Sequence, residues 1–323
     1  MNKLNICVIG LGGVGGYFGG KLARTFSSNS DPSANVFFVA RGRHLKAIRE
    51  NGLILKSPEF GTITCSPTLA TERISDLPPI DFFLIAVKGY DLMEASISMK
   101  DHVRKDTIIL APLNGADIQE RLRNTVHAGI ILPSCVYISS YIEEPGVVRT
   151  GKPGKIIFGS DPAYPDDIPH ELFKLFQKSS IDYEWKEDAN PAIWEKYIFI
   201  ASFSLVSAFH NRTLGEILEK PPLKKEVIAI MNEIKSIALK KKIQLPDGIV
   251  DLSVKKATLF PPDTQTSLQR DLSQKKERNE LDLFGGTILY LGKEMGIPTP
   301  TTREIYRELE KISSSPGTPE MPE

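Results

Sequence analysis

The chain has 323 residues, of which 41% are hydrophobic and 25% are charged, and its 40 Lys and Arg balance 40 Asp and Glu. This length predicts two domains, and the composition excludes a chain that is disordered throughout. Because the formal net charge is zero, we expect neither a nucleic acid nor an anionic membrane as a partner. Charge-free stretches at 4–20 and 124–142 are interrupted by glycines or by Pro133, so no transmembrane segment is predicted.

The first half of the chain alternates apolar runs with helical patterns. Strands are predicted at 4–9, 36–40, 82–87 and 107–111, and helices at 14–24 and 43–51. Residues 26–35 are predicted to form a polar loop. Strands that are apolar on both faces and separated by helices indicate a parallel sheet covered on both sides, which is the Rossmann-type α/β architecture. The segment 146–158 is rich in glycine and β-branched residues and predicts an antiparallel hairpin at the sheet edge.

After Asp188 the pattern becomes helical. We expect an NADP-binding domain over 1–187 and an all-helical domain over 188–312, followed by a disordered tail at 313–323. The predicted helices are 190–210, 223–242, 248–259, an interrupted helix at 267–296, and 301–312. Cys7, Cys65 and Cys135 form no metal-ligand pattern, so they are predicted to be buried thiols in a reducing cytoplasm, and no metal site is expected.

A glycine motif follows the first predicted strand. It has the pattern G-x-G-x-x-G and consists of Gly10, Leu11, Gly12, Gly13, Val14 and Gly15. Placed between a strand and a helix, this motif binds a dinucleotide: the first glycine permits a tight turn, the second lets the pyrophosphate approach, and the third allows close helix packing. A glycine-rich turn without a ligand is the alternative.

The second predicted strand ends at Arg41, where an NAD-preferring site would carry an acid. A guanidinium can bind a 2′-phosphate through charge-assisted hydrogen bonds, so we predict NADP as the cofactor. Arg43 follows in the next helix and is equally well explained as a surface arginine. The same surface explanation stays open for Arg41.

These motifs resemble those of ketopantoate reductases (2-dehydropantoate 2-reductases). The likeness covers about residues 4–312 and rests on GLGGVGG at 10–16, ARG at 40–42, AVK at 86–88, LNG at 113–115, WEK at 194–196, LGE at 214–216, TSLQRD at 266–271, ELD at 280–282 and GIPTP at 296–300. The family reduces a ketone with NADPH on the route to pantothenate and coenzyme A. The resemblance implies an active site in the cleft between a Rossmann domain and a helical domain.

Lys196 is the predicted proton donor. It lies in the apolar run 193–200, an unusual place for a solvated lysine, and desolvation would lower its pKa towards neutrality. The alternative is a lysine that only extends to the surface or pairs with Glu195. By resemblance, Lys88 contacts the cofactor and Asn114 lies near both the nicotinamide ribose and the substrate. A surface lysine and a turn-forming Asn-Gly pair are the respective alternatives.

By the same resemblance, Ser267 binds the substrate and Glu280 binds the substrate hydroxyl while pairing with Lys196. A helix cap is the alternative for Ser267, and a solvated run of charges is the alternative for Glu280.

The chain departs from the family at several substrate positions. Ile200 and Ser204 stand where the family commonly has asparagine, and Leu214 replaces another, with Asn211 nearby. The spacing from Asp271 to Glu280 is one residue longer than usual. Ile200 and Ser204 follow Lys196 on one helix face and are therefore predicted to line the substrate pocket.

We therefore predict an NADPH-dependent reductase of ketopantoate, a small-molecule 2-oxo acid. A relative that reduces a different 2-oxo acid and a non-catalytic NADPH sensor remain the alternatives. A homodimer is compatible with the sequence, which fixes neither the oligomeric state nor the kinetic order.

Overall fold

The computed structural model describes residues 3–26 and 31–314, which form two compact units. The first unit contains the described residues up to Leu113 together with Asp117–Asn190, and the second contains Asn114–Ala116 and the described residues from Pro191 onward. The last helix ends at Ser314, two residues into the segment that was predicted to be a disordered tail. The rest of that tail, and residues 27–30 of the predicted polar loop, lie outside the described residues.

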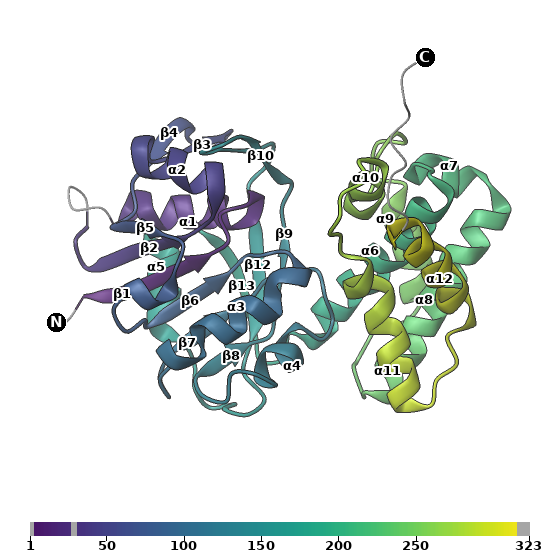
Figure 1. The fold of residues 1–323 in the computed structure, drawn as a ribbon. Coiled ribbons are helices and arrows are strands. Elements are labelled where there is room, and N and C mark those ends of the chain that lie inside the picture. Colours follow the sequence, from purple (N-terminus) through teal and green to yellow (C-terminus); the bar gives the residue numbers. More distant parts are fainter. Residues whose placement is uncertain (1–2, 27–30, 315–323) are drawn as a thin grey trace, which may run out of the picture. The chain divides into compact units, whose positions relative to one another are not determined.

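The first unit is built on a parallel six-stranded sheet with the order β5-β2-β1-β6-β7-β8 (Figure 1). The predicted strands at 4–9, 36–40, 82–87 and 107–111 are confirmed as β1, β2, β6 and β7, and the Rossmann-type fold class is confirmed with them. The bounds are β1 (Leu4–Ile9), β2 (Ala34–Val39), β5 (Leu69–Thr71), β6 (Phe82–Ile85), β7 (Ile108–Leu110) and β8 (Ile130–Leu132). The helices are α1 (Gly13–Thr25), α2 (Gly42–Asn51), α3 (Leu92–Met99), α4 (Ile118–Arg123) and α5 (His170–Lys178).

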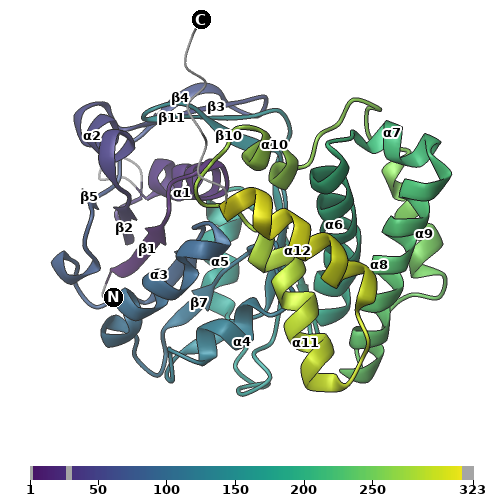
Figure 2. The same cartoon turned by 45° about the vertical axis from the view of Figure 1, so that its right-hand side comes forward.

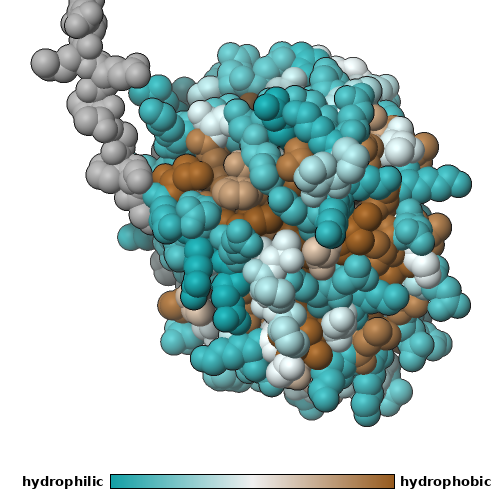
Figure 3. All heavy atoms as spheres, turned by 90° about the vertical axis from the view of Figure 1, so that its right-hand side faces the viewer, coloured by the Kyte–Doolittle hydropathy of each residue, from teal (hydrophilic) through white to brown (hydrophobic). Residues whose placement is uncertain are grey.

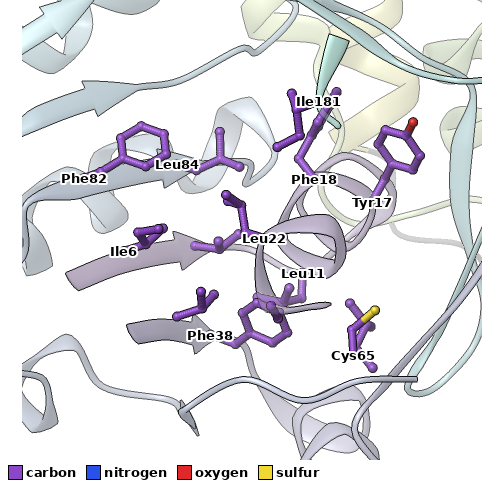
Figure 4. Packing of buried hydrophobic residues seen from close by; sticks show 14 of the residues in the cluster. Ile6, Leu11, Tyr17, Phe18, Leu22, Phe38, Cys65, Phe82, Leu84 and Ile181 are labelled. Atoms are coloured by element: carbon purple, nitrogen blue, oxygen red, sulfur yellow. The ribbon is translucent and has the colours of Figure 1, made fainter. Parts of the chain in front are cut away.

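Helix α1 packs on the parallel sheet and on a second sheet, so nearly its whole surface is buried. Figure 4 shows Phe18 and Leu22 of α1 among side chains of the strands. Glycines make the close approach possible: a Cβ at Gly19 would lie 3.2 Å from the ring of Phe38. Tyr17, also on α1, has a hydroxyl that accepts a hydrogen bond from the backbone N–H of Gly154 at 3.2 Å.

The predicted hairpin at 146–158 is wrong, because its two strands belong to different sheets. β11 (Val147–Thr150) pairs with β10 (Ser140–Glu144) and β3 (Leu53–Ser57), in a sheet completed by β4 (Gly61–Cys65). β12 (Lys155–Gly159) pairs with β9 (Ser134–Tyr137) and β13 (Asp182–Lys186). The hairpin that forms is β10–β11, which turns at Gly146 with φ of 83°.

The second unit contains helices and no strand among its described residues, as predicted. Figure 2 shows its helices most clearly. They are α6 (Asn190–His210), α7 (Leu214–Glu219), α8 (Pro221–Lys240), α9 (Ile249–Ala257), α10 (Ser267–Ser273), α11 (Thr287–Met295) and α12 (Pro300–Ser314). The helix predicted at 267–296 is interrupted, with a π-helical turn at Asp282–Gly286 before α11. By length and composition α6 could cross a membrane, and 72% of its apolar window is buried inside the structure.

The face shown in Figure 3 is mainly hydrophilic, with apolar side chains gathered in several patches. The exposed large hydrophobic residues of the second unit include Leu252, Leu259 and Phe260. The homodimer allowed by the sequence stays a prediction. Cys7, Cys65 and Cys135 are buried, as predicted, and burial raises the pKa of Cys65 to about 12.

Candidate active site

The glycine motif forms the turn from β1 into α1. Gly10 has a φ of 87°, and a Cβ there would lie 2.9 Å from the carbonyl carbon of Ala86. Gly12 faces open space, with no atom within 4 Å of a Cβ added to it, whereas a Cβ on Gly15 would meet the methyl group of Ala86 at 3.0 Å. The chain thus makes a tight turn at Gly10, leaves open space at Gly12 and packs closely at Gly15. A pyrophosphate-binding loop requires these three features in this order.

Leu11 and Val14 occupy the other two positions of this motif. Leu11 is buried in the core beneath the loop, close to α1 (Figure 4). Val14 is partly buried and packs against the same core. Their side chains hold the loop in place, so any contact of these two residues with a dinucleotide would come from the backbone, whose N–H groups lie at the start of α1.

Arg41 directly precedes α2 and is exposed, which suits a residue that meets a cofactor phosphate. Its guanidinium pairs with the carboxylate of Glu94 on α3, including a contact of 3.3 Å from Nη1 to Oε2. This hydrogen bond raises the pKa of Arg41, with smaller charge contributions from Asp91 and Glu72. Arg41 therefore lies among carboxylates that a 2′-phosphate would have to compete with.

Lys88 follows the end of β6 and begins the turn Gly89–Asp91. β1 and β6 are adjacent in the sheet, and the order of strands reverses between them. In open α/β sheets ligands bind at the carboxyl ends of the strands, where this reversal occurs. Lys88 is exposed at that edge.

Lys196 lies on α6 in the second unit and is only 8% exposed. Its ammonium donates a hydrogen bond of 2.7 Å to Oδ1 of Asn114. Asn114 belongs to the short segment 114–116, which is part of the second unit. The structure therefore brings together two of the predicted site residues, and it excludes the explanation of Lys196 as a solvated lysine.

Glu280 is only 5% exposed, so the alternative of a solvated run of charges is wrong for this residue. It lies directly before the helical segment that contains the π-helical turn, and its carbonyl accepts a hydrogen bond from the N–H of Phe284 at 3.1 Å. Tyr197, the neighbour of Lys196, donates from its hydroxyl to the carbonyls of Leu283 at 3.1 Å and Phe284 at 2.6 Å. These hydrogen bonds connect α6 to the π-helical turn that follows Glu280. Sequence reasoning gave Tyr197 no role.

Ile200 and Ser204 follow Lys196 at intervals of four residues and share its helix face. Ile200 is partly buried against the helical core, and Ser204 is buried. Leu214, at another departure from the family, is buried at the start of α7 beside its capping residue Thr213.

Ser267 does not cap α10. Thr266 does, since its hydroxyl accepts a hydrogen bond from the N–H of Gln269 at 3.2 Å, and Ser267 is the first helical residue. The same hydroxyl lies 2.7 Å from the Ser207 hydroxyl on α6. The side chain of Gln269 donates to Oδ1 of Asn211 at 3.1 Å. Asn211 thus keeps its amide nitrogen as a donor, and its Oδ1 can accept one further hydrogen bond.

Within residues 3–26 and 31–314, no group of three or more His, Cys, Asp or Glu side chains could hold a metal ion. Together these features define a dinucleotide-binding fold joined to a helical unit that holds a buried lysine.

Comparison with known families agrees with this class. A model described as "Ketopantoate reductase PanE/ApbA" matches residues 6–163, and its C-terminal counterpart matches residues 188–313. The chain belongs to the ketopantoate reductase PanE/ApbA family, an oxidoreductase family.

Individual relatives are distant but extend over nearly the whole chain. A 2-dehydropantoate 2-reductase of Streptococcus pyogenes is 25% identical over 93% of this chain and 95% of its own. An uncharacterized oxidoreductase of Bacillus subtilis, YkpB, is 23% identical over 95% and 98%. The crystal structure of a 2-dehydropantoate 2-reductase from Porphyromonas gingivalis is 27% identical, covers 96% of this chain and 100% of its own, and has a TM-score of 0.79.

Proposed function

We propose that this protein is an NADPH-dependent reductase that converts 2-dehydropantoate (ketopantoate) into pantoate, in the cytoplasm, on the route to pantothenate and coenzyme A. The observation that carries the proposal is the buried ammonium of Lys196 held on Asn114 at 2.7 Å. A lysine costs free energy when it is removed from water, and a purely structural helix would not need it there. Membership of the reductase family supports the same assignment.

The cofactor is assigned to the glycine loop of the first unit. Gly12 leaves the loop open to a pyrophosphate, and Gly10 and Gly15 hold the turn against Ala86. Arg41 would bind the 2′-phosphate once it is released from Glu94, and Lys88 would contact the cofactor at the end of β6. When bound, NADPH supplies the hydride that reduces the ketone carbon.

Lys196 is the proposed source of positive charge and of a proton for the carbonyl oxygen of the substrate. As hydride reaches the carbon, negative charge develops on oxygen, and a positioned ammonium both stabilises this charge and donates the proton. Asn114 accepts one of the three N–H bonds of the ammonium and thereby fixes its direction. In this proposal Asn114 also lies near the nicotinamide ribose.

The substrate assignments are Ser267 and Glu280 for the polar ends of the molecule and Ile200 for its dimethyl carbon. Ile200 is the aliphatic residue on the face of Lys196, and Ser204 lies one turn further along that face. Glu280, as a buried carboxyl group, is suited to hold the substrate hydroxyl. Buried hydrogen-bonding groups discriminate strongly against ligands that leave them unpaired.

NADPH oxidation tests the proposal directly. The purified protein should consume NADPH when ketopantoate is added and should form pantoate in equal amount. Consumption with other 2-oxo acids but not with ketopantoate would favour the second candidate, a reductase of a different 2-oxo acid. Ile200 supports that candidate, because an aliphatic group there removes a polar contact beside Lys196. Binding of NADPH without any turnover would favour a sensor.

A further inference from the structure

His44 lies on α2 in the first unit, half-buried, and joins two backbone groups. Its Nδ1 is 2.9 Å from the backbone nitrogen of Gly146, and its Nε2 is 2.8 Å from the carbonyl oxygen of Leu11. A backbone N–H can only donate and a carbonyl can only accept. Nδ1 must therefore be the acceptor and Nε2 must carry the proton, so the ring that makes both bonds is neutral.

The two bonds connect the glycine loop to the hairpin β10–β11. Leu11 is the second residue of the loop, and Gly146 is the turn of the hairpin. The carbonyl of Gly146 in turn accepts from the N–H of Ile54 on β3 at 2.9 Å, and a Cβ on Gly146 would lie 2.8 Å from the Cβ of Ala47. The hairpin turn is therefore fixed on α2 and β3.

The same hairpin supports the start of α1 at two further points. A Cβ on Gly13 would collide with the backbone of Ser140 on β10, and a Cβ on Gly16 would lie 2.5 Å from a methyl group of Val148 on β11. Contact at the glycines keeps the loop close to the hairpin, but contact alone does not set the orientation of the peptide groups. The hydrogen bond to the Leu11 carbonyl does, because it fixes the peptide that joins Leu11 to Gly12.

We propose that His44 is a positioning residue for the cofactor: its neutral ring locks the glycine loop to the β10–β11 hairpin in the geometry that receives a pyrophosphate, and protonation of the ring releases Gly146 and weakens cofactor binding. This inference rests on the proposed use of a dinucleotide. It assigns a function to a histidine that no sequence motif singled out.

The charged residues near His44 on α2 and on the hairpin are either exposed or paired with other side chains. Arg43 and Lys46 on α2 and Glu144 on the hairpin are exposed. Glu143, also on the hairpin, is held by Arg149 at 2.7 Å and Lys56 of β3 at 2.6 Å, and these bonds lower its pKa. Histidine is the side chain whose ordinary pKa lies closest to neutral pH, so the imidazole is the group in this region that the proposal uses.

The direction of the pH effect follows from the environment of His44. Burial lowers its pKa from 6.5, and the bond to the Leu11 carbonyl opposes that shift. The neutral ring therefore prevails above pH 6.5, where a change of pH should not alter cofactor affinity through His44. As the pH falls through the lowered pKa, affinity should decrease by up to about tenfold per pH unit, since one proton is taken up.

Two variants separate the two bonds. His44→Asn places an amide oxygen near the position of Nδ1 and can still accept from Gly146, whereas His44→Gln places an amide nitrogen near Nε2 and can still donate to Leu11. His44→Ala loses both bonds. We expect His44→Ala to weaken NADP⁺ and NAD⁺ alike by about tenfold or more, as for one or two neutral hydrogen bonds, with smaller losses for the other two.

Calorimetric titration with NADP⁺ between pH 5.5 and 8 provides the test, with His127→Gln at an exposed histidine as control. The 2′-phosphate also titrates near pH 6, but it does so equally in every variant, so the difference between wild type and His44→Asn isolates the imidazole. We expect the tighter binding of the wild type relative to His44→Asn to diminish as the pH falls below 6.5, because only the wild type loses its acceptor for Gly146, and we expect kcat at saturating cofactor to stay near the wild-type value. Parallel pH profiles, or wild-type affinity in His44→Ala, would overturn the proposal.

Amide hydrogen exchange keeps the test independent of the proposed function. Protection of the Gly146 N–H should survive in His44→Asn and fall in His44→Gln, which lacks the acceptor. Unchanged protection of the Gly146 N–H in both variants would contradict the hydrogen bond between His44 and Gly146. If the wild-type protein bound neither dinucleotide while this exchange pattern held, the proposed function would fail and the connection between loop and hairpin would stand.

Discussion

The ammonium of Lys196 donates to Oδ1 of Asn114 at 2.7 Å, although 82 positions separate the two residues in the chain. Both belong to the second unit, because the segment 114–116 is part of that unit although the residues before and after it belong to the first unit. A buried lysine thus obtains an uncharged acceptor that orients its ammonium without neutralising it. This pair is the basis of the proposed proton transfer.

Replacing Lys196 tests its chemical role. Lys196→Ala should lower kcat by about two to four orders of magnitude, the usual contribution of a positioned general acid, while the dissociation constant of NADPH stays near that of wild type. Steady-state kinetics and a fluorescence titration of NADPH measure the two quantities. Lys225→Ala, at an exposed lysine of α8, is the matched control. Full turnover in Lys196→Ala would remove the assignment.

Arg41 is predicted to select the phosphorylated cofactor. Arg41→Ala should weaken NADPH by about one to two orders of magnitude, the value of one charge-assisted hydrogen bond of about 1.5–3 kcal/mol, and should leave NADH almost unchanged. Binding titrations with both cofactors measure the ratio. An equal loss for NADPH and NADH would mean that Arg41 does not contact the 2′-phosphate.

Glu94 is predicted to compete with that phosphate for Arg41. Both side chains of the pair are more than half exposed, so the pair contributes at most about 1 kcal/mol. Glu94→Gln should therefore tighten NADPH by up to about fivefold at low ionic strength without affecting NADH. Glu50→Gln removes the same charge from the exposed part of α2 and serves as control. Weaker binding of NADPH in Glu94→Gln would indicate that the carboxylate orients Arg41 instead.

Glu233 on α8 is predicted to stabilise the second unit. It is 9% exposed and accepts hydrogen bonds at the start of α12 from the N–H of Thr301 at 2.8 Å and of Thr302 at 3.1 Å, and from the Thr302 hydroxyl. Glu233→Ala leaves these buried donors unpaired, which should cost about 2–3 kcal/mol.

Urea unfolding of a Trp185→Phe background measures this effect, because Trp194 on α6 then reports on the second unit alone. The midpoint should fall by about 1 M urea or more. The matched control is Glu310→Ala, at an exposed residue of α12. Equal midpoints for Glu233→Ala and Glu310→Ala would mean that the helix start is satisfied in another way.

The sequence predicted the fold well where local patterns decide the structure. The helix at 190–210 was predicted to within about one residue of its observed bounds, because Asn190 and Pro191 mark its beginning and the run that follows is mainly apolar. The pairing of Val147–Thr150 was not predictable in this way. β11 pairs with β3, some ninety residues earlier in the chain, and no local turn signal encodes such a partner.

The candidate site likewise contains features that a local motif predicts and contacts that it does not predict. The roles of Gly10, Gly12 and Gly15 follow from a motif in which every residue is local, and the backbone geometry agrees with them. Two contacts depend instead on which elements lie close together in the folded chain. They are the hydrogen bond from Lys196 to Asn114 and the ion pair of Arg41 with Glu94. His44 and Tyr197 went unnoticed because their partners are backbone groups, which carry no sequence signal.

The most direct measurement of the central claim is a panel of 2-oxo acids assayed by NADPH consumption. The account predicts that ketopantoate has the highest kcat/KM, above pyruvate, oxaloacetate and 2-oxoisovalerate. 2-Oxoisovalerate is the decisive comparison, since it keeps the branched carbon and lacks the hydroxyl that Glu280 is proposed to bind. A pocket built to hydrogen-bond this hydroxyl should favour ketopantoate by several orders of magnitude. Equal kcat/KM values for the two acids would contradict the account.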